Sequence, residues 1–220
     1  MAQLIASAGN SSSTIQINRP SWKDMYSYYP KENISSANFY PMVSQEYVNL
    51  VNERPDDWEN TCAARMSYAL NRSGIRLPKA PAGGTLVGND KFNYWVRVKD
   101  LKAFMIKRFK SPDISYSPKQ VSATRSTEAK QRIKEVETQL LPKIKGKKGI
   151  IVFDVTGWGN ASGHFTLWDG KNLAYVGPGD HNNPASIEYY FWFMRENIGF
   201  DNGFKITIAQ TIKISFWELK

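Results

Sequence analysis

The stretch 150-IIVFDV-155 decides the fold class, because it marks a change from helical to strand periodicity along the chain. An unbroken β-prone run of this kind is typical of a central strand that is buried on both faces. Residues 164–168 (HFTLW) predict a second strand, and the Asp-Gly dipeptide at 169–170 is a strong hairpin-turn signal. Residues 172–176 are expected to return as its partner, and residues 205–217 to close the sheet as one or two strands.

Helical patterns precede these strands. A helix is expected to begin at Cys62 and to end before Gly74, which suits the position after a helix C-terminus. Its expected buried stripe comprises Cys62, Met66, Ala69, Leu70 and Ser73. Periodicity predicts further helices at residues 98–109 and 127–141, the second of them ended by Pro142. Helices followed by strands indicate an α+β fold, with helices packed on a central antiparallel sheet.

The remaining segments give weaker patterns. A short helix is expected after Pro41, and another at the aromatic-rich residues 186–195. Residues 21–40 hold aromatic residues among prolines, which predicts an irregular segment pinned by aromatic burial. Residues 1–20 are rich in Ser and Asn and predict a loosely held polar arm. No linker divides residues 21–220, so we expect them to form a single domain.

Composition limits the class of protein. The chain has 220 residues, 41% of them hydrophobic, which supplies a core that needs no disulfide or metal. The 29 basic and 20 acidic residues give a net charge of +9, which favours an anionic partner such as nucleic acid or wall polymer. No stretch approaches the roughly 20 apolar residues of a membrane span, and the N-terminus lacks the basic and apolar regions of a secretory signal. We therefore expect synthesis in the cytosol, no stable membrane insertion, and export without a cleaved signal.

Cys62 is the only cysteine and stands at the expected start of a helix. A thiol in the first turn faces unpaired backbone N–H groups and the positive end of the helix dipole, and both favour the thiolate. One cysteine forms neither an intrachain disulfide nor a multi-cysteine metal site. Cys62 is therefore either a buried apolar residue or a nucleophile.

His164 could supply the base that a cysteine nucleophile needs. It follows Gly163 at the start of the second expected strand, where a glycine leaves room for access. A helix-start cysteine with a later strand histidine is the arrangement of cysteine hydrolases, in which imidazole takes the thiol proton. The alternative is a core cysteine and a hydrogen-bonded core histidine. The other histidine, His181, is expected to be a solvated loop residue, and the sequence predicts no zinc site or other cofactor.

Two blocks of the sequence resemble the type VI secretion amidase effectors of the fourth group. The cysteine block is residues 58–71 (WENTCAARMSYALN), followed by Gly74 and the Leu-Pro pair at 77–78. The histidine block comprises residues 149–153 (GIIVF), 157–158 (GW) and 162–170 (SGHFTLWDG). The resemblance implies a papain-like fold related to NlpC/P60 peptidases. It also implies hydrolysis of the γ-D-glutamyl–meso-diaminopimelate amide in peptidoglycan stem peptides.

The resemblance assigns Cys62 as nucleophile and His164 as general base. The family places an acidic residue shortly after the hairpin turn, commonly in a loop that contains a cysteine. This chain has no cysteine or carboxylate there, so Asp180 is the nearest candidate to orient the histidine. Asp169 in the turn and Asp154 on the preceding strand are the alternatives, although Asp169 is adequately explained by turn chemistry.

Other residues are expected to shape the cleft. The backbone N–H of Cys62 and a neighbouring amide would form the oxyanion hole. Asn60 is expected to add a polar contact there or to cap the helix, and Gly163 to leave access to the histidine. Trp58 and Trp158 are expected to wall the cleft or to lie in the core.

The partners implied by the resemblance are a peptidoglycan peptide, a cognate immunity protein and components of the secretion apparatus, with no nucleic acid. The implied place of action is the periplasm of a target cell. Another class of function is a basic, non-enzymatic module that binds nucleic acid or wall polymer, with Cys62 structural. A housekeeping NlpC/P60 peptidase is disfavoured, because such an enzyme needs a signal for export.

Overall fold

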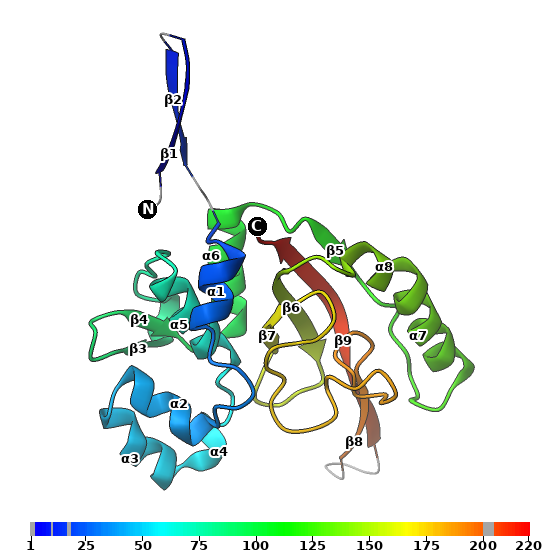
Figure 1. Cartoon of the computed structure of the whole chain (residues 1–220). Helices are drawn as coiled ribbons and strands as arrows, with labels where there is room; N and C mark the ends of the chain where they lie inside the picture. Colours follow the sequence, from blue (N-terminus) through cyan, green and yellow to red (C-terminus); the bar gives the residue numbers. More distant parts are fainter. Residues whose placement is uncertain (1–2, 10, 17–18, 200–204) are drawn as a thin grey trace.

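The computed structural model describes residues 3–9, 11–16, 19–199 and 205–220 of the chain. Helices α1 to α6 gather on one side of the molecule, which we call the helical half, and the large sheet with α7 and α8 forms the sheet half (Figure 1). The helices are α1 (Trp22–Tyr28), α2 (Ser36–Val43), α3 (Glu46–Glu53), α4 (Pro55–Trp58), α5 (Cys62–Arg72), α6 (Val98–Phe109), α7 (Thr127–Gln139) and α8 (Leu141–Ile144). The strands are β1 (Gln3–Ala8), β2 (Ser11–Gln16), β3 (Thr85–Val87), β4 (Asn93–Trp95), β5 (Ile114–Tyr116), β6 (Gly149–Thr156), β7 (Gly163–Trp168), β8 (Met194–Gly199) and β9 (Lys205–Glu218).

The large sheet is antiparallel, with strand order β5-β9-β6-β7, and β8 pairs with the free part of β9. Strand β6 is central, as its continuous apolar sequence predicts: Val152 faces Phe165 of β7 on one side and Ser215 of β9 on the other. Gly163 is required at the start of β7, because a Cβ there would lie 2.2 Å from the carbonyl oxygen of Phe153. Gly163 pairs with Asp154 at the end of the β6–β7 ladder, and the next residue, His164, lies opposite Phe153.

Both faces of β6 are buried, each in a different core. Ile150 and Val152 point to the helical half and pack with α5 and α6, whereas Ile151 and Phe153 point to α7 and α8. This alternation follows from the two-residue period of a strand. Each such side chain, once fully buried, stabilises the fold by about 1.5–3 kcal/mol. The predicted α+β class, with helices packed on an antiparallel sheet, is therefore confirmed, although β5 of that sheet precedes α7 and the small pairs β1–β2 and β3–β4 precede it as well.

Helix α5 lies at the centre of the helical half and is buried on nearly all sides, not along a single stripe. It packs against α1, α6, β4 and β7. Even polar side chains of α5, namely Arg65, Ser67 and Asn71, are buried. The predicted stripe is therefore too narrow, because neighbours from both halves cover the helix.

Several predicted elements are confirmed with nearly the same bounds. Helix α6 spans the predicted residues 98–109, and residues 205–218 form one long strand with a register shift opposite Asp154 and Val155. The helix predicted at 127–141 ends at Gln139, and Pro142 lies in the first turn of α8. That position suits proline, whose missing N–H has no partner in a first turn.

Other predicted elements are wrong. Residues 21–40 are not irregular, since α1 lies within them and α2 begins there, each capped by a serine side chain. The short helix expected after Pro41 is present as α3, which begins at Glu46, but Pro41 itself lies inside α2. Residues 186–195 form turns leading into β8, not a helix, and residues 172–176 pair with β7 only through the single bridge Trp168–Leu173.

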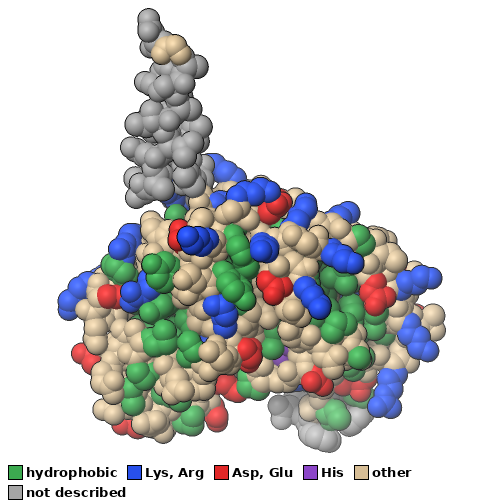
Figure 2. Space-filling model, in the orientation of Figure 1, with side chains coloured by type: hydrophobic (Ala, Val, Ile, Leu, Met, Phe, Trp, Pro, Cys, Tyr) green, Lys and Arg blue, Asp and Glu red, His purple; other side chains and the backbone are tan. Residues whose placement is uncertain are grey.

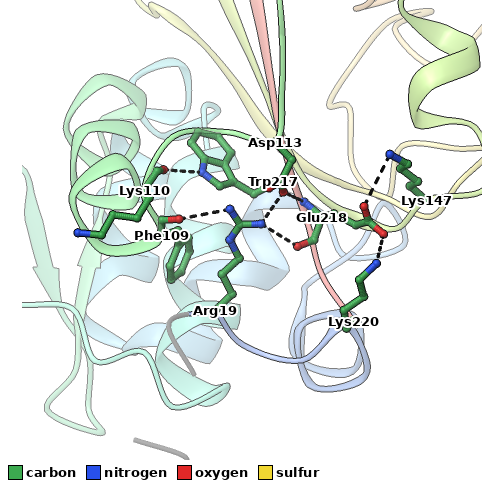
Figure 3. A network of polar contacts seen from close by, with 8 residues as sticks. All are labelled: Arg19, Phe109, Lys110, Asp113, Lys147, Trp217, Glu218 and Lys220. Carbon is green, nitrogen blue, oxygen red and sulfur yellow. Dashed lines mark hydrogen bonds and ion pairs between the residues drawn. The ribbon is translucent and has the colours of Figure 1, made fainter. Parts of the chain in front are cut away.

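The N-terminal arm contains the β1–β2 hairpin, which stands away from the body of the molecule in Figure 1. Residues 1–2, 10 and 17–18 of this arm lie outside the described residues. The chain joins the body at Arg19, whose guanidinium pairs with Asp113 and also donates to the carbonyl oxygens of Glu218 (3.1 Å) and Phe109 (3.3 Å) (Figure 3). Arg19 thereby ties the start of α1 to the end of α6 and the end of β9.

The visible face in Figure 2 is charged unevenly, with basic side chains concentrated towards the arm and acidic ones around a histidine in the lower part. Within the described ranges no helix has the length and apolarity of a membrane span. The same part of the chain contains no group of three or more His, Cys, Asp or Glu side chains arranged to hold a metal ion.

Arg132 of α7 fastens the outer helices to the sheet. It is 1% exposed and donates to the carbonyl oxygens of Lys119 (2.6 Å), Thr211 (2.5 Å) and Trp192 (3.3 Å). No carboxylate pairs with it among the described residues, and burial lowers its pKa to about 10. The guanidinium is therefore held by uncharged acceptors, namely main-chain carbonyl groups and the side-chain amide oxygen of Gln210 (3.4 Å), and its loss would leave several buried acceptors without a donor.

We expect Arg132→Ala to lower the free energy of unfolding by about 3 kcal/mol, because buried carbonyl groups lose their donors. Lys130→Ala, an exposed change two residues earlier on the same helix, should alter it by less than about 0.5 kcal/mol. Urea unfolding followed by circular dichroism measures both. Equal midpoints for the two variants would contradict this role of Arg132.

Candidate functional site

Cys62 is the first residue of α5 and is 7% exposed. The preceding residue, Thr61, makes no side-chain cap for the helix, since its hydroxyl accepts from Arg65 Nε (2.7 Å) instead. The N–H groups of the first turn thus have no capping side chain and face the thiol position. A helix N-terminus that lacks such a cap favours negative charge on a nearby atom.

Two opposing effects act on the thiol. The backbone N–H groups of Cys62, Ala63 and Phe165 lie against the sulfur, and together with the charge of Arg65 they act to lower the pKa of Cys62. Burial has the larger effect, so the net pKa of the thiol is raised above its ordinary value. In the free protein the sulfur is therefore a thiol, surrounded by donors that would stabilise charge once it forms.

His164 is 5% exposed, and its Nε2 lies 2.9 Å from the carbonyl oxygen of Tyr175. Burial lowers the pKa of His164 to about 3, and the nearby His181 and Arg65 act in the same direction, while the bond to Tyr175 opposes them. The imidazole is therefore neutral at ordinary pH.

The Tyr175 carbonyl fixes the tautomer of His164. A carbonyl oxygen only accepts, so Nε2 carries the proton of the neutral ring. Nδ1 is then the nitrogen with the free lone pair. A neutral imidazole in this tautomer, with Nε2 held by the Tyr175 carbonyl, is prepared to take a proton at Nδ1.

A stack of four rings holds the imidazole in place. His164 stacks on Tyr190 at 4.5 Å between centroids and lies 5.6 Å from the Tyr175 ring. His181 also stacks on Tyr190, at 4.5 Å between ring centroids, and is the fourth ring of the stack. His181 is thus 5% exposed, with Nδ1 bonded to the Glu188 carbonyl (2.8 Å), so the expectation of a solvated loop histidine is wrong.

Arg65 connects the cysteine helix to the loop that carries Tyr175. Its guanidinium is fully buried and lies 4.0 Å over the Tyr175 ring. It donates to the carbonyl oxygens of Pro30 (3.1 Å), Lys31 (3.2 Å) and Ile34 (2.6 Å). The hydroxyl of Thr61 also lies 3.0 Å from that of Tyr175. One buried cation therefore joins α5, the loop at residues 30–34 and the loop that holds His164.

Cys62 and His164 line the same cavity, of about 290 Å³, which we call the histidine cavity. Its other walls include the buried Tyr175 and Tyr190 and the exposed Arg195. Arg195 forms a bidentate ion pair with Glu188 (2.8 and 2.6 Å). The structure therefore brings the two predicted side chains, 102 positions apart in sequence, to one cavity between the helical half and the sheet half.

Asp180 does not lie where it was expected. It is exposed in a turn, where its carbonyl accepts from Asn183 N–H, and it is absent from the walls of the histidine cavity. The position beside His164 Nε2 is filled by the Tyr175 carbonyl. The reason is the path of the loop: the bond from Tyr175 N–H to Thr166 Oγ1 (3.0 Å) holds the loop against β7 before it reaches residue 180.

The two alternative carboxylates have other partners. Asp169 Oδ1 accepts from the N–H groups of Lys171 (2.8 Å) and Asn172 (2.6 Å), which is turn chemistry. Asp154 forms an ion pair with Lys102 of α6. Neither carboxylate bonds to His164 among the described residues.

The expected cleft residues fall in different places. Trp158 lines the histidine cavity and packs edge-on against Tyr190. Gly163 lines it as well, at the point where β7 begins. Trp58 instead packs against Tyr40 and lines a neighbouring cavity. Asn60 lines both cavities and makes no side-chain cap, so its reading as a capping residue is not supported.

Sequence reasoning missed the groups that hold the histidine. The Tyr175 carbonyl left no signal, because any residue supplies a carbonyl and only the path of the loop places it. Arg65 did carry a signal, since an arginine among apolar residues on an inward-facing helix must find buried acceptors.

Comparisons with known proteins identify the family and the fold. The family model described as type VI secretion system (T6SS), amidase effector protein 4, matches residues 58–217. The effector Tae4 of Enterobacter cloacae, solved in complex with Tai4, is 25% identical with a TM-score of 0.60, covering 92% of this chain and 99% of that one. The Tae4–Tai4 complex of Salmonella Typhimurium is 22% identical with a TM-score of 0.57, covering 92% and 99%. No curated protein sequence matches the chain.

The family match spans both halves of the molecule and includes Cys62, His164 and Tyr175. The similar solved structures have the same arrangement of helices and antiparallel sheet, which is papain-like. The chain belongs to the family of type VI secretion amidase effectors, group 4.

Proposed function

We propose that this chain is an antibacterial cysteine amidase that hydrolyses the γ-D-glutamyl–meso-diaminopimelate bond of peptidoglycan stem peptides. The observation that carries the proposal is the shared cavity of Cys62 and His164, in which the imidazole is neutral and Nδ1 is free. A thiol at a helix start beside a neutral imidazole is the pair that acyl transfer needs. Membership of the amidase family supports the substrate class.

The proposed reaction begins with attack of Cys62 Sγ on the amide carbon, while Nδ1 of His164 takes the thiol proton. The developing oxyanion accepts from the backbone N–H groups at the start of α5. The intermediate then breaks the C–N bond, and His164 returns its proton to the leaving amine. A thioester links Cys62 to the glutamyl carbon. Water, deprotonated by His164, hydrolyses this thioester and regenerates the thiol.

In this mechanism a main-chain carbonyl replaces the side chain that orients the histidine. The 2.9 Å contact from His164 Nε2 to Tyr175 O keeps the proton on Nε2. A carbonyl is uncharged, so it stabilises the imidazolium less than a carboxylate does. Burial lowers the pKa of His164, and the bond to the Tyr175 carbonyl offsets only part of that effect.

The proposal extends to partners and place of action. Similar proteins have been solved as effector–immunity complexes, which supports a cognate immunity protein for this chain. We infer delivery by the secretion apparatus and action on peptidoglycan in the periplasm of a target cell. Residues 21–220 would act as one catalytic domain.

We expect Cys62→Ala to lower cleavage of purified peptidoglycan by at least about a thousandfold, because the nucleophile is lost. Mass analysis of the digest should show fragments ending in γ-D-glutamate with wild type and none with the variant. The melting temperatures of the two proteins should agree. Equal fragments from both proteins would contradict the cysteine mechanism, and cleavage at another bond would contradict the proposed substrate.

Asp180→Asn should leave kcat/KM within about twofold of wild type, because the Tyr175 carbonyl already holds His164 Nε2. Steady-state hydrolysis of a purified muropeptide tests this. His164→Gln is the matched comparison and should remove activity. A loss above about tenfold for Asp180→Asn, with unchanged folding, would assign the orienting role to the carboxylate after all.

A further inference from the structure

Three cavities of the molecule meet at two asparagine side chains. The histidine cavity is the first of them. The second, of about 370 Å³, lies along the start of α6 beside Lys99 and also touches Cys62. The third, of about 560 Å³, is lined by Tyr40 and Trp58, whose rings pack against each other in its wall. Asn60 and Asn160 line all three cavities, so they stand at the junction.

The two asparagines approach this junction from opposite halves of the molecule. Asn60 precedes α5 in the helical half, and Asn160 lies in the β6–β7 loop of the sheet half. Both are exposed, and neither side chain makes a hydrogen bond within the part of the chain that the structure describes. Any extended chain that passes Cys62 from the histidine cavity into either neighbouring cavity therefore runs beside both side chains.

Their backbones are anchored although their side chains have no partners. The loop that carries Asn160 is closed by a bond from Val155 N–H to the Ser162 carbonyl (3.1 Å). Its first residue, Gly157, accepts from the Asn197 side chain (2.7 Å) and has no room for a Cβ, which would lie 2.7 Å from Ala209 Cα.

The segment before α5 is anchored too. The carbonyl of Trp58 accepts from Tyr40 (3.0 Å), and that of Glu59 from Ser36 (3.2 Å). A fixed backbone with a side chain that lacks a partner is pre-organised for a ligand, because little ordering entropy is lost when it binds.

We propose that Asn60 and Asn160 form a clamp that binds the peptide groups of the substrate on either side of the scissile bond. A carboxamide offers one acceptor and one donating NH2 group, which match the N–H and C=O groups of a peptide chain. The inference rests on the proposed amidase function. It assigns these residues to substrate binding, and they take no part in the proton transfers.

The test is steady-state hydrolysis of a purified disaccharide-tetrapeptide muropeptide by Asn60→Ala, Asn160→Ala and the double variant. Each lost neutral hydrogen bond corresponds to roughly a twofold to tenfold rise in KM, and the double variant should exceed either single one. kcat should stay within about twofold of wild type. Asn52→Ala, an exposed asparagine of α3 outside the three cavities, is the matched control and should behave as wild type.

A second measurement separates this inference from the proposed function. Calorimetry with the same muropeptide, on protein carrying Cys62→Ser, should show weaker binding when Asn160→Ala is added. If wild type fails to cleave the muropeptide, the proposed function fails, while calorimetry still decides on the clamp. The clamp would be overturned by an unchanged KM in the Asn60→Ala, Asn160→Ala double variant together with unchanged affinity in calorimetry. A fall confined to kcat would overturn it as well.

Discussion

The buried guanidinium of Arg65 is the interaction on which the site depends. A cation removed from water must be matched by acceptors, and burying it without them costs several kcal/mol. No carboxylate pairs with Arg65 among the described residues, so the chain supplies three carbonyl groups of residues 30–34, the Thr61 hydroxyl and the Tyr175 ring. These groups come from three separate segments. Satisfying one cation therefore fixes the relative position of the cysteine helix and the loop beside the histidine.

That constraint explains the electrostatic character of the site. The fixed loop presents the Tyr175 carbonyl to His164, and the surrounding rings exclude water from the imidazole. Burial lowers the pKa of His164 and raises that of Cys62, so both shifts favour an uncharged thiol and imidazole before substrate binds. Charge then appears only during attack, when the N–H groups of Cys62, Ala63 and Phe165 are already beside the sulfur. Donors that are in place before the reaction need no reorganisation during it.

Local sequence patterns correctly predicted the elements whose conformation is determined by nearby residues. The apolar run of β6, the period of α6 and the helix-start position of Cys62 all depend on neighbours a few residues away. Residues 186–195 could not be predicted in this way. Their turns are held by contacts such as Trp192 Nε1 to the Ser186 carbonyl (2.8 Å) and Tyr190 N–H to the His181 carbonyl (3.1 Å), which override helical periodicity. The acceptor beside His164 could not be predicted either. Every residue has a main-chain carbonyl, and only tertiary packing determines which one lies next to the imidazole.

The central claim is that a main-chain carbonyl holds His164 as a neutral base, and nitrogen-15 NMR of its imidazole tests this most directly. The chain has two histidines, so the signals can be assigned by comparison with a His181→Asn variant. We expect the His164 ring to carry its proton on Nε2 and to stay neutral at a pH of about 5, below its ordinary pKa of 6.5. An imidazolium at a pH of about 6, or a proton on Nδ1 in the neutral ring, would contradict the account.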